Sequence, residues 1–165
     1  MRVWKFGNDV DTDAIIPGRF LTIYDPKELA AHAFEGTRND FAKGVRPGDI
    51  IVAGSNFGSG SSREHAPLAL KGAGVQLVVA QSFARIFFRN AINIGLLPLT
   101  CPDTGGIEDG ETAAVDLESN TLSVDGRSYT LEPIPAFVRE IVRAGGLVPY
   151  ARGLKGGVQC TVLQR

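Results

Sequence analysis

The chain has 165 residues, 44% of them hydrophobic, which suits one domain with a sizeable core, so we expect residues 1–165 to form a single domain. Its formal net charge of −1 gives no electrostatic case for binding nucleic acid or a membrane surface. The sequence shows neither the basic and apolar regions of a signal peptide nor an apolar run of membrane-spanning length, which predicts a cytoplasmic protein.

The first third of the chain predicts a strand, an acidic turn and a helix. Residues 2–6 mix polar and apolar side chains as a half-buried strand does. Residues 8–13 hold three carboxylates but lack the glycine and closing glutamate of a calcium-binding EF-hand loop, so Asx turns and helix caps explain them better. Residues 27–34 show helical spacing, and residues 39–45 form a short, partly helical connector.

Residues 19–24, here called the recognition loop, combine loop signals with a large apolar fraction. Pro17-Gly18 before them is typical of a turn, and the next helix begins only at Pro26, with Asp25 as its cap. Apolar side chains in such a loop commonly pack against the core. The alternative is that they line a binding site.

The centre of the chain predicts a buried strand, a glycine–serine loop and a helix. Residues 49–53 are apolar and rich in β-branched side chains, and residues 66–73 follow with helical spacing. The glycine–serine loop, residues 54–65, therefore enters a helix N-terminus, where free N–H groups and the helix dipole favour an anion.

Ser61, Ser62 and Arg63 of this loop allow more than one interpretation. Ser61 with Glu64 three residues later fits a capping box, which is a purely structural role. A phosphate loop fits less well, because the Walker ending is absent and Arg63 stands where the third dinucleotide-binding glycine would fall. A small carboxylic acid fits better, because a guanidinium can hold a carboxylate through two parallel hydrogen bonds.

The segments after this loop continue the sheet. Residues 75–80 form a second strand, parallel to the first because a helix connects them. Ser82 is predicted to cap a helix over residues 83–92, and residues 96–99 form a third strand. The inward face of that helix would consist of Phe83, Ile86, Phe87 and Ala91.

The last third predicts an antiparallel layer and one more helix. Residues 113–117, 121–124 and 127–131 alternate between polar and apolar, with Asp125-Gly126 as a hairpin turn. Residues 136–143 form a helix with Phe137 and Ile141 inward, and residues 158–163 add an edge strand. The two cysteines, Cys101 and Cys160, lie far apart without a CxxC partner. We expect reduced thiols and no metal site.

Five ordered motifs resemble the swivelling domain of the aconitase superfamily, and most closely the free-standing small subunits of isopropylmalate isomerase and homoaconitase. The resemblance spans almost the whole chain and implies an α/β fold of three layers, β/β/α, in which a parallel βαβ unit is joined by antiparallel strands. The motifs are Asp11-Thr12-Asp13-Ala14-Ile15-Ile16-Pro17, Gly58-Ser59-Gly60-Ser61-Ser62-Arg63-Glu64-His65-Ala66, Ser82-Phe83-Ala84-Arg85-Ile86-Phe87, Asn93-Ile94-Gly95-Leu96-Leu97-Pro98-Leu99 and Ala144-Gly145-Gly146-Leu147-Val148-Pro149-Tyr150.

The resemblance implies one subunit of a hydro-lyase that isomerises a 2-hydroxy acid by removing water and adding it back. The partner would be a larger subunit that carries a [4Fe-4S] cluster, since this chain lacks the cysteines to hold one. By motif position, Ser61 would take the carbon-bound proton of the substrate, and Ser62 and Arg63 would hold a substrate carboxylate. Asp13 and Gly60 would support this site.

In the related small subunits, the equivalent of the recognition loop distinguishes one malate-type substrate from another. Here Leu21, Thr22 and Ile23 offer no partner for a further carboxylate, although Arg19 could turn inward. The resemblance therefore favours an alkyl substituent, which is that of isopropylmalate in leucine biosynthesis. The alternatives are homoaconitase of lysine biosynthesis or another malate-type dehydratase, and an accessory module that merely binds an anion. Self-association of the isolated chain stays open.

Overall fold

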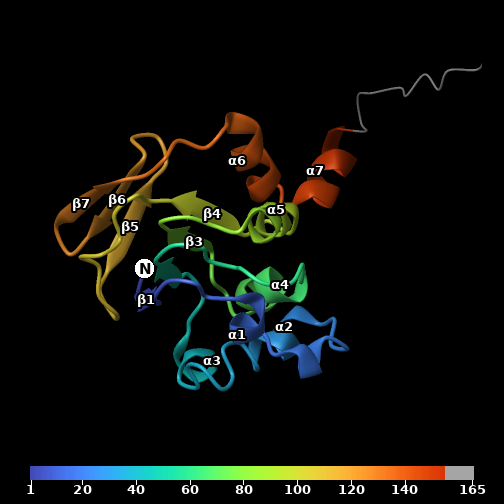
Figure 1. The fold of residues 1–165 in the computed structure, drawn as a ribbon. Coiled ribbons are helices and arrows are strands. Elements are labelled where there is room, and N and C mark those ends of the chain that lie inside the picture. The colour runs from blue at the N-terminus through green and yellow to red at the C-terminus, as the bar shows by residue number, and fades with distance from the viewer. Residues whose placement is uncertain (155–165) are drawn as a thin grey trace, which may run out of the picture.

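The computed structural model describes residues 1–154. The strand expected over residues 158–163, and Cys160, lie outside the described residues. Two sheets and a group of helices form three layers (Figure 1). A parallel sheet of strand order β1-β2-β3-β4 stands between the helices on one face and an antiparallel sheet, β5-β6-β7, on the other. The expected β/β/α architecture is therefore confirmed.

The strands are short and are connected mostly by loops and short helices. The strands are β1 (Val3–Lys5), β2 (Ile50–Ala53), β3 (Leu77–Ala80), β4 (Leu97–Thr100), β5 (Ala113–Asp116), β6 (Thr121–Val124) and β7 (Arg127–Thr130). The helical elements are α1 (Thr12–Ile15), the 3-10 turn η1 (Gly18–Phe20), α2 (Pro26–Ala30), α3 (Phe41–Gly44), α4 (His65–Gly72), α5 (Arg85–Asn93), α6 (Ala136–Arg143) and α7 (Leu147–Leu154). Among the described residues, no helix is long and apolar enough to cross a membrane.

The parallel sheet is apolar on both faces because both faces are covered. Residues that are in register across it share a face: Val3, Ile50 and Leu77 pack against the antiparallel sheet, whereas Trp4 and Ile51 pack against the helices. This double burial explains the uninterrupted apolar runs that predicted the strands. Their carboxyl ends meet at one edge of the sheet, and the glycine–serine loop leaves β2 at that edge.

The antiparallel layer and its hairpin turn are also confirmed. The turn residues Asp125 and Gly126 have φ values of 42° and 83°, as a two-residue turn between antiparallel strands requires. On β6, Leu122 and Val124 are buried in the core between the two sheets. Their spacing of two residues is the alternation seen in the sequence.

The helix predicted over residues 27–34 is wrong beyond Ala30. Phe34 has a φ of 58°, and its N–H donates to the carbonyl of Ile15 at 2.8 Å rather than to a preceding helix carbonyl. The Phe34 ring is buried against Phe6 and Phe41, with centroid distances of 4.2 and 4.9 Å. Tertiary packing of this ring therefore overrides the local helical pattern.

Two details of the predicted helix over residues 83–92 are wrong. The helix α5 begins at Arg85 without a side-chain cap, because the hydroxyl of Ser82 instead accepts a hydrogen bond from the N–H of Asn56 at 2.8 Å. This bond ties the loop after β3 to the glycine–serine loop. Ile86, which was expected on the inward face, lies at the surface and is 47% exposed, whereas Phe87 is buried.

The predicted inward face of α6 is wrong for Phe137, which is 58% exposed. The buried residues are Val138 and Ile141, one turn apart, and Val142 packs beside the core between the sheets. The last helix, α7, follows Gly145 and Gly146, both with positive φ, and packs on α6 (Figure 1). It was not predicted as a helix.

Gly58 is a position where the fold requires glycine. It has a φ of 78°, and a Cβ built there would clash with the ring of Phe87. Gly58→Ala is therefore expected to lower the free energy of unfolding by about 2–4 kcal/mol, the sum of left-handed strain and overpacking. Urea denaturation of the purified chain measures this. Gly7→Ala, where a Cβ meets nothing within 4 Å, is the control and should change stability by less than about 1 kcal/mol; equal effects would contradict the prediction.

Candidate active site

The glycine–serine loop is held at the carboxyl edge of the parallel sheet by the loops beside it. The N–H of Gly54 donates to the carbonyl of Gly7 after β1, and the N–H of Gln81 after β3 donates to the carbonyl of Gly54, at 3.0 and 3.1 Å. The N–H of Phe57 donates to the carbonyl of Ser82 at 3.0 Å. Ligands of open α/β sheets bind at this edge, so the predicted site lies where the fold favours one.

The first residue of α1, Thr12, fixes the part of the loop that carries Ser61. The N–H of Thr12 donates to the carbonyl of Ser59 at 2.9 Å, and the Thr12 hydroxyl donates to the carbonyl of Ser61 at 3.0 Å. Gly60 lies between these bonds with a φ of 87°. The loop backbone is thus fixed on both sides of Gly60, while the side chains of Ser61 and Ser62 are exposed.

Thr12 is a residue that the sequence interpretation missed. It is only 2% exposed, although it lies in an acidic, turn-rich segment. Asp11 beside it accepts a hydrogen bond from the N–H of Ala14 at 2.6 Å and so caps α1, as expected for carboxylates in this segment. The motif around Thr12 and Asp13 was the only signal for its position.

Arg63 and Asp13 form an ion pair in the site, between Nη1 of Arg63 and Oδ1 of Asp13. The Arg63 side chain is 18% exposed and the Asp13 side chain 58%. A Cβ built on Gly18 would lie 3.6 Å from the Asp13 Oδ1 and 3.7 Å from both terminal nitrogens of Arg63. The structure therefore brings Asp13, Arg63 and the start of the recognition loop together, and other guanidinium donors of Arg63 stay available to a ligand.

Ser61 does not act as a helix cap. The helix α4 begins at His65 after Glu64, and no side chain caps its N-terminus. Within residues 1–154, the hydroxyl of Ser61 makes no hydrogen bond. The capping-box interpretation is therefore wrong. The helix begins within one residue of the predicted start, and residues 62–64 separate Ser61 from its N-terminus.

Two aromatic contacts hold the ends of the recognition loop, and they use both histidines of the chain. At the start, the Phe20 ring stacks on His32 with centroids 3.8 Å apart. At the end, the Tyr24 ring lies 5.4 Å from the ring of His65. Between them, Leu21 and Ile23 are half-buried and Thr22 is exposed. The structure thus anchors the loop and leaves Thr22 at its surface.

Arg19 points to Glu35 rather than toward Arg63. Its Nη2 lies 2.5 Å from Glu35 Oε1, and its guanidinium carbon lies 4.6 Å from the centre of the Phe20 ring. The other carboxylate oxygen of Glu35 lies 2.7 Å from Nδ1 of His32. Hydrogen bonds from His32 and Arg19 hold the pKa of Glu35 below its usual value.

His65 was not used in the sequence interpretation, although it lies two residues after Arg63. Its Nε2 atom is buried and has no hydrogen-bond partner among the described residues. A buried polar atom without a partner is uncommon and costs about 1–3 kcal/mol. The buried Nε2 of His65, at the start of α4, therefore lowers the stability of the fold beside the site.

The described residues offer no ligand set for a metal: no group of three or more His, Cys, Asp or Glu side chains in residues 1–154 could hold one. Cys101 is buried, and its sulfur donates to the carbonyl of Asp103 at 3.1 Å. Burial raises the pKa of this thiol. A cubane cluster needs several thiolates, which Cys101 alone does not supply.

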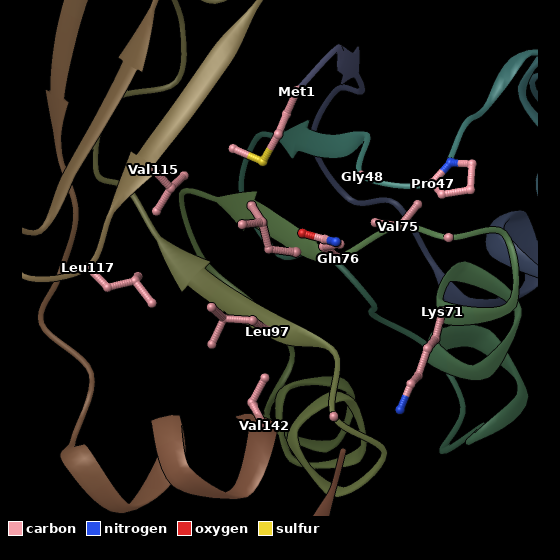
Figure 2. A pocket seen from close by; sticks show the side chains of 13 residues that line it. Met1, Pro47, Gly48, Lys71, Val75, Gln76, Leu97, Val115, Leu117 and Val142 are labelled. Atoms are coloured by element: carbon pink, nitrogen blue, oxygen red, sulfur yellow. The ribbon is translucent and has the colours of Figure 1, made fainter. Parts of the chain in front are cut away.

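A cavity of about 630 Å³ opens at the opposite edge of the parallel sheet, where the strands begin (Figure 2). Its lining is mostly apolar and includes Val75, Leu97 and Val115. The ammonium group of Lys71 at its border donates to the carbonyls of Ile94 and Gly145. The cavity offers no pair of acid and base groups, so the carboxyl edge is the better candidate for chemistry.

Comparison with known proteins agrees with the fold and the motifs. The model of the aconitase C-terminal domain matches residues 40–104. The 3-isopropylmalate dehydratase small subunit of Methanosarcina mazei is 61% identical over 93% of this chain and 96% of that protein. The isopropylmalate/citramalate isomerase small subunit of Methanocaldococcus jannaschii is 52% identical over 92% of each chain.

One solved structure is similar to this chain over most of its length. The crystal structure of a 3-isopropylmalate dehydratase chain from Methanocaldococcus jannaschii superimposes with a TM-score of 0.89, at 49% identity over 93% of each chain. The 3-isopropylmalate dehydratase small subunit 1 of Archaeoglobus fulgidus is 55% identical over 93% of this chain and 97% of that protein. The chain therefore belongs to the hydro-lyase family of 3-isopropylmalate dehydratase small subunits, within the aconitase superfamily.

Proposed function

We propose that this chain is the small subunit of an enzyme that interconverts 2-isopropylmalate and 3-isopropylmalate by dehydration and rehydration, as in leucine biosynthesis. The observation that carries the proposal is the Asp13–Arg63 ion pair beside the exposed hydroxyls of Ser61 and Ser62. Such a group suits a small hydroxy acid, because a fixed guanidinium binds its carboxylate and a nearby oxygen reaches its reacting carbon. High identity to proteins named for this reaction supports the choice of substrate.

Arg63 and Ser62 bind a carboxylate of the substrate in this proposal. Asp13 engages Nη1 of Arg63 and thereby sets the orientation of the guanidinium plane. The low exposure of Arg63, 18%, strengthens its attraction to an anion relative to an arginine in bulk water. Gly18 leaves space beside this pair, since any side chain there would contact both residues.

Ser61 is the base in this proposal: its oxygen takes the carbon-bound proton while the C–H electrons form the double bond and hydroxide leaves the neighbouring carbon. Rehydration adds water with the opposite regiochemistry: hydroxide bonds to the carbon that lost its proton, and Ser61 returns the proton to the carbon that lost hydroxide. Serine is a weak base unless its oxyanion is stabilised. Arg63 two residues away and the N-terminus of α4 supply positive potential for this.

The partner would be the large subunit that the family name implies. The iron–sulfur cluster expected on that subunit would supply a Lewis acid for the departing hydroxyl. The exposure of Ser61 and Ser62 fits a site whose other wall comes from a second polypeptide. The rival hypothesis is a module that binds an anion without catalysis, for which the Ser61 hydroxyl would be dispensable.

The recognition loop would contact the substituent that distinguishes malate-type acids. Leu21 and Ile23 offer methyl groups, and the guanidinium of Arg19 is engaged with Glu35. Burying an unpaired carboxylate there is costly, so an alkyl group is favoured over the carboxyalkyl group of a homoaconitase substrate. Methyl-lined pockets separate alkyl groups by only about 1–3 kcal/mol. Citramalate, for which the Methanocaldococcus jannaschii relative is also named, is therefore a second candidate substrate.

Ser61→Ala tests the base. We expect the reconstituted heteromer to lose about 10²–10⁴-fold in kcat, because no other group takes the carbon-bound proton. The midpoint of thermal unfolding should stay within a few degrees of the original, since the hydroxyl makes no hydrogen bond within the described part of the chain. Ser59→Ala in the same loop is the control and should retain activity. Full turnover by Ser61→Ala would favour the anion-binding module.

Asp13→Asn tests the positioning of Arg63. We expect KM for isopropylmalate to rise about tenfold with a smaller change in kcat, because a charge-assisted hydrogen bond that orients the carboxylate-binding group becomes a neutral one. Steady-state kinetics of the heteromer measure both constants. Asp9→Asn, in the same exposed segment, is the control. A loss confined to kcat would contradict a role in carboxylate binding.

Thr22→Arg tests the recognition loop. A guanidinium at this exposed position should raise kcat/KM for a carboxyalkyl malate relative to isopropylmalate by about tenfold or more, because it pairs the added carboxylate. Ser128→Arg on β7 adds the same charge far along the chain and should leave the ratio unchanged. An unchanged ratio in Thr22→Arg would remove the assigned role of the loop.

A further inference from the structure

The recognition loop carries an arginine, Arg19, next to Arg63, the proposed carboxylate-binding residue. A Cβ built on Gly18 would lie 3.6–3.7 Å from side-chain atoms of Asp13 and Arg63, and Arg19 is the next residue in the chain. A long cationic side chain at this position can reach the substrate substituent from the start of the loop. In the structure it turns away to Glu35, which lies in the turn after α2.

Several contacts hold Arg19 in this orientation. Glu35 accepts from Arg19 through one carboxylate oxygen and contacts His32 through the other, at 2.5 and 2.7 Å. His32 in turn stacks on the Phe20 ring. The Arg19 guanidinium also lies over the Phe20 ring. Arg19, Phe20, His32 and Glu35 thus form one cluster, here called the arginine clamp, in which Glu35 supplies the negative charge.

We propose that Glu35 is a specificity-determining residue, which holds Arg19 away from the substrate and so keeps the recognition loop selective for alkyl substituents. This inference rests on the proposed function. A free arginine beside the substituent would compensate the desolvation of an added carboxylate, which is the main penalty against such substrates. The arginine clamp keeps Arg19 from pairing with such a carboxylate.

The size of the effect follows from the exposure of the pair. The Arg19 side chain is 60% exposed and the Glu35 side chain 39%, so solvent screens the ion pair and its contribution is small. Releasing Arg19 should therefore change the preference between two substrates by only about fivefold. The effect lies in the ratio of substrates, because Glu35 belongs to no predicted catalytic or carboxylate-binding group.

The experiment compares kcat/KM for a carboxyalkyl malate with kcat/KM for isopropylmalate in the reconstituted heteromer. Glu35→Gln, which removes the charge but keeps the shape, should raise this ratio about fivefold. Glu35→Asp, which keeps the charge, should stay near the original ratio. Glu28→Gln, an exposed carboxylate on α2, is the matched control and should not change it.

Arg19→Gln completes a double-mutant cycle with Glu35→Gln. In the original background it should leave the ratio unchanged, and combined with Glu35→Gln it should cancel the fivefold rise, because Arg19 is the group that is released. An unchanged ratio in Glu35→Gln, or a rise that survives in the double variant, would overturn the inference. An original heteromer that is inactive on isopropylmalate would instead overturn the proposed function, a separate result visible before any variant is made.

Discussion

The site depends on two hydrogen bonds that one threonine makes across the chain. Thr12 donates from its N–H to the carbonyl of Ser59 and from its hydroxyl to the carbonyl of Ser61. Because Asp13 follows Thr12 directly, these bonds also bring its carboxylate to Arg63, which lies 50 positions later in the chain. The loop can approach this closely only because Gly58 and Gly60 adopt positive φ values. A turn with this backbone geometry positions the serines before any substrate binds.

The three layers determine where the hydrogen bonds of Thr12 and the Asp13–Arg63 ion pair can form. The parallel sheet is covered by the antiparallel sheet on one face and by helices on the other, so its edges are the places left for function (Figure 1). The carboxyl edge gathers the loops after β1, β2 and β3, whose backbones are bonded to one another. The recognition loop is joined to the same edge through Gly18, and its ends rest on His32 and His65. The proposed binding of the acid and the proposed recognition of its substituent would thus involve neighbouring segments of one edge.

The sequence predicted the strands, the hairpin and the loop, because burial on both faces and turn chemistry are local signals. It failed where a distant partner decides: Phe34 leaves the helix to fill a gap between Phe6 and Phe41, and Ser82 binds Asn56 instead of capping α5. For the site, the motifs predicted that Asp13 and Arg63 belong together, whereas the support from Thr12 and the arginine clamp could not be read from residue types. Their contacts depend on segments that are brought together only by the folded sheet and helices. The proposed roles of Ser61, Ser62 and the loop residues stay predictions.

The most direct test of the account is a crystal structure of the reconstituted heteromer with isopropylmalate bound. We expect the Ser61 oxygen to lie within about 3–3.5 Å of the carbon that loses its proton, which is the separation of reacting atoms in a productive complex. We also expect a substrate carboxylate on Arg63 with the Asp13 ion pair intact, and the isopropyl group against Leu21 and Ile23. A substrate whose reacting carbon is approached by a base of the partner subunit, with Ser61 turned away, would contradict the central claim.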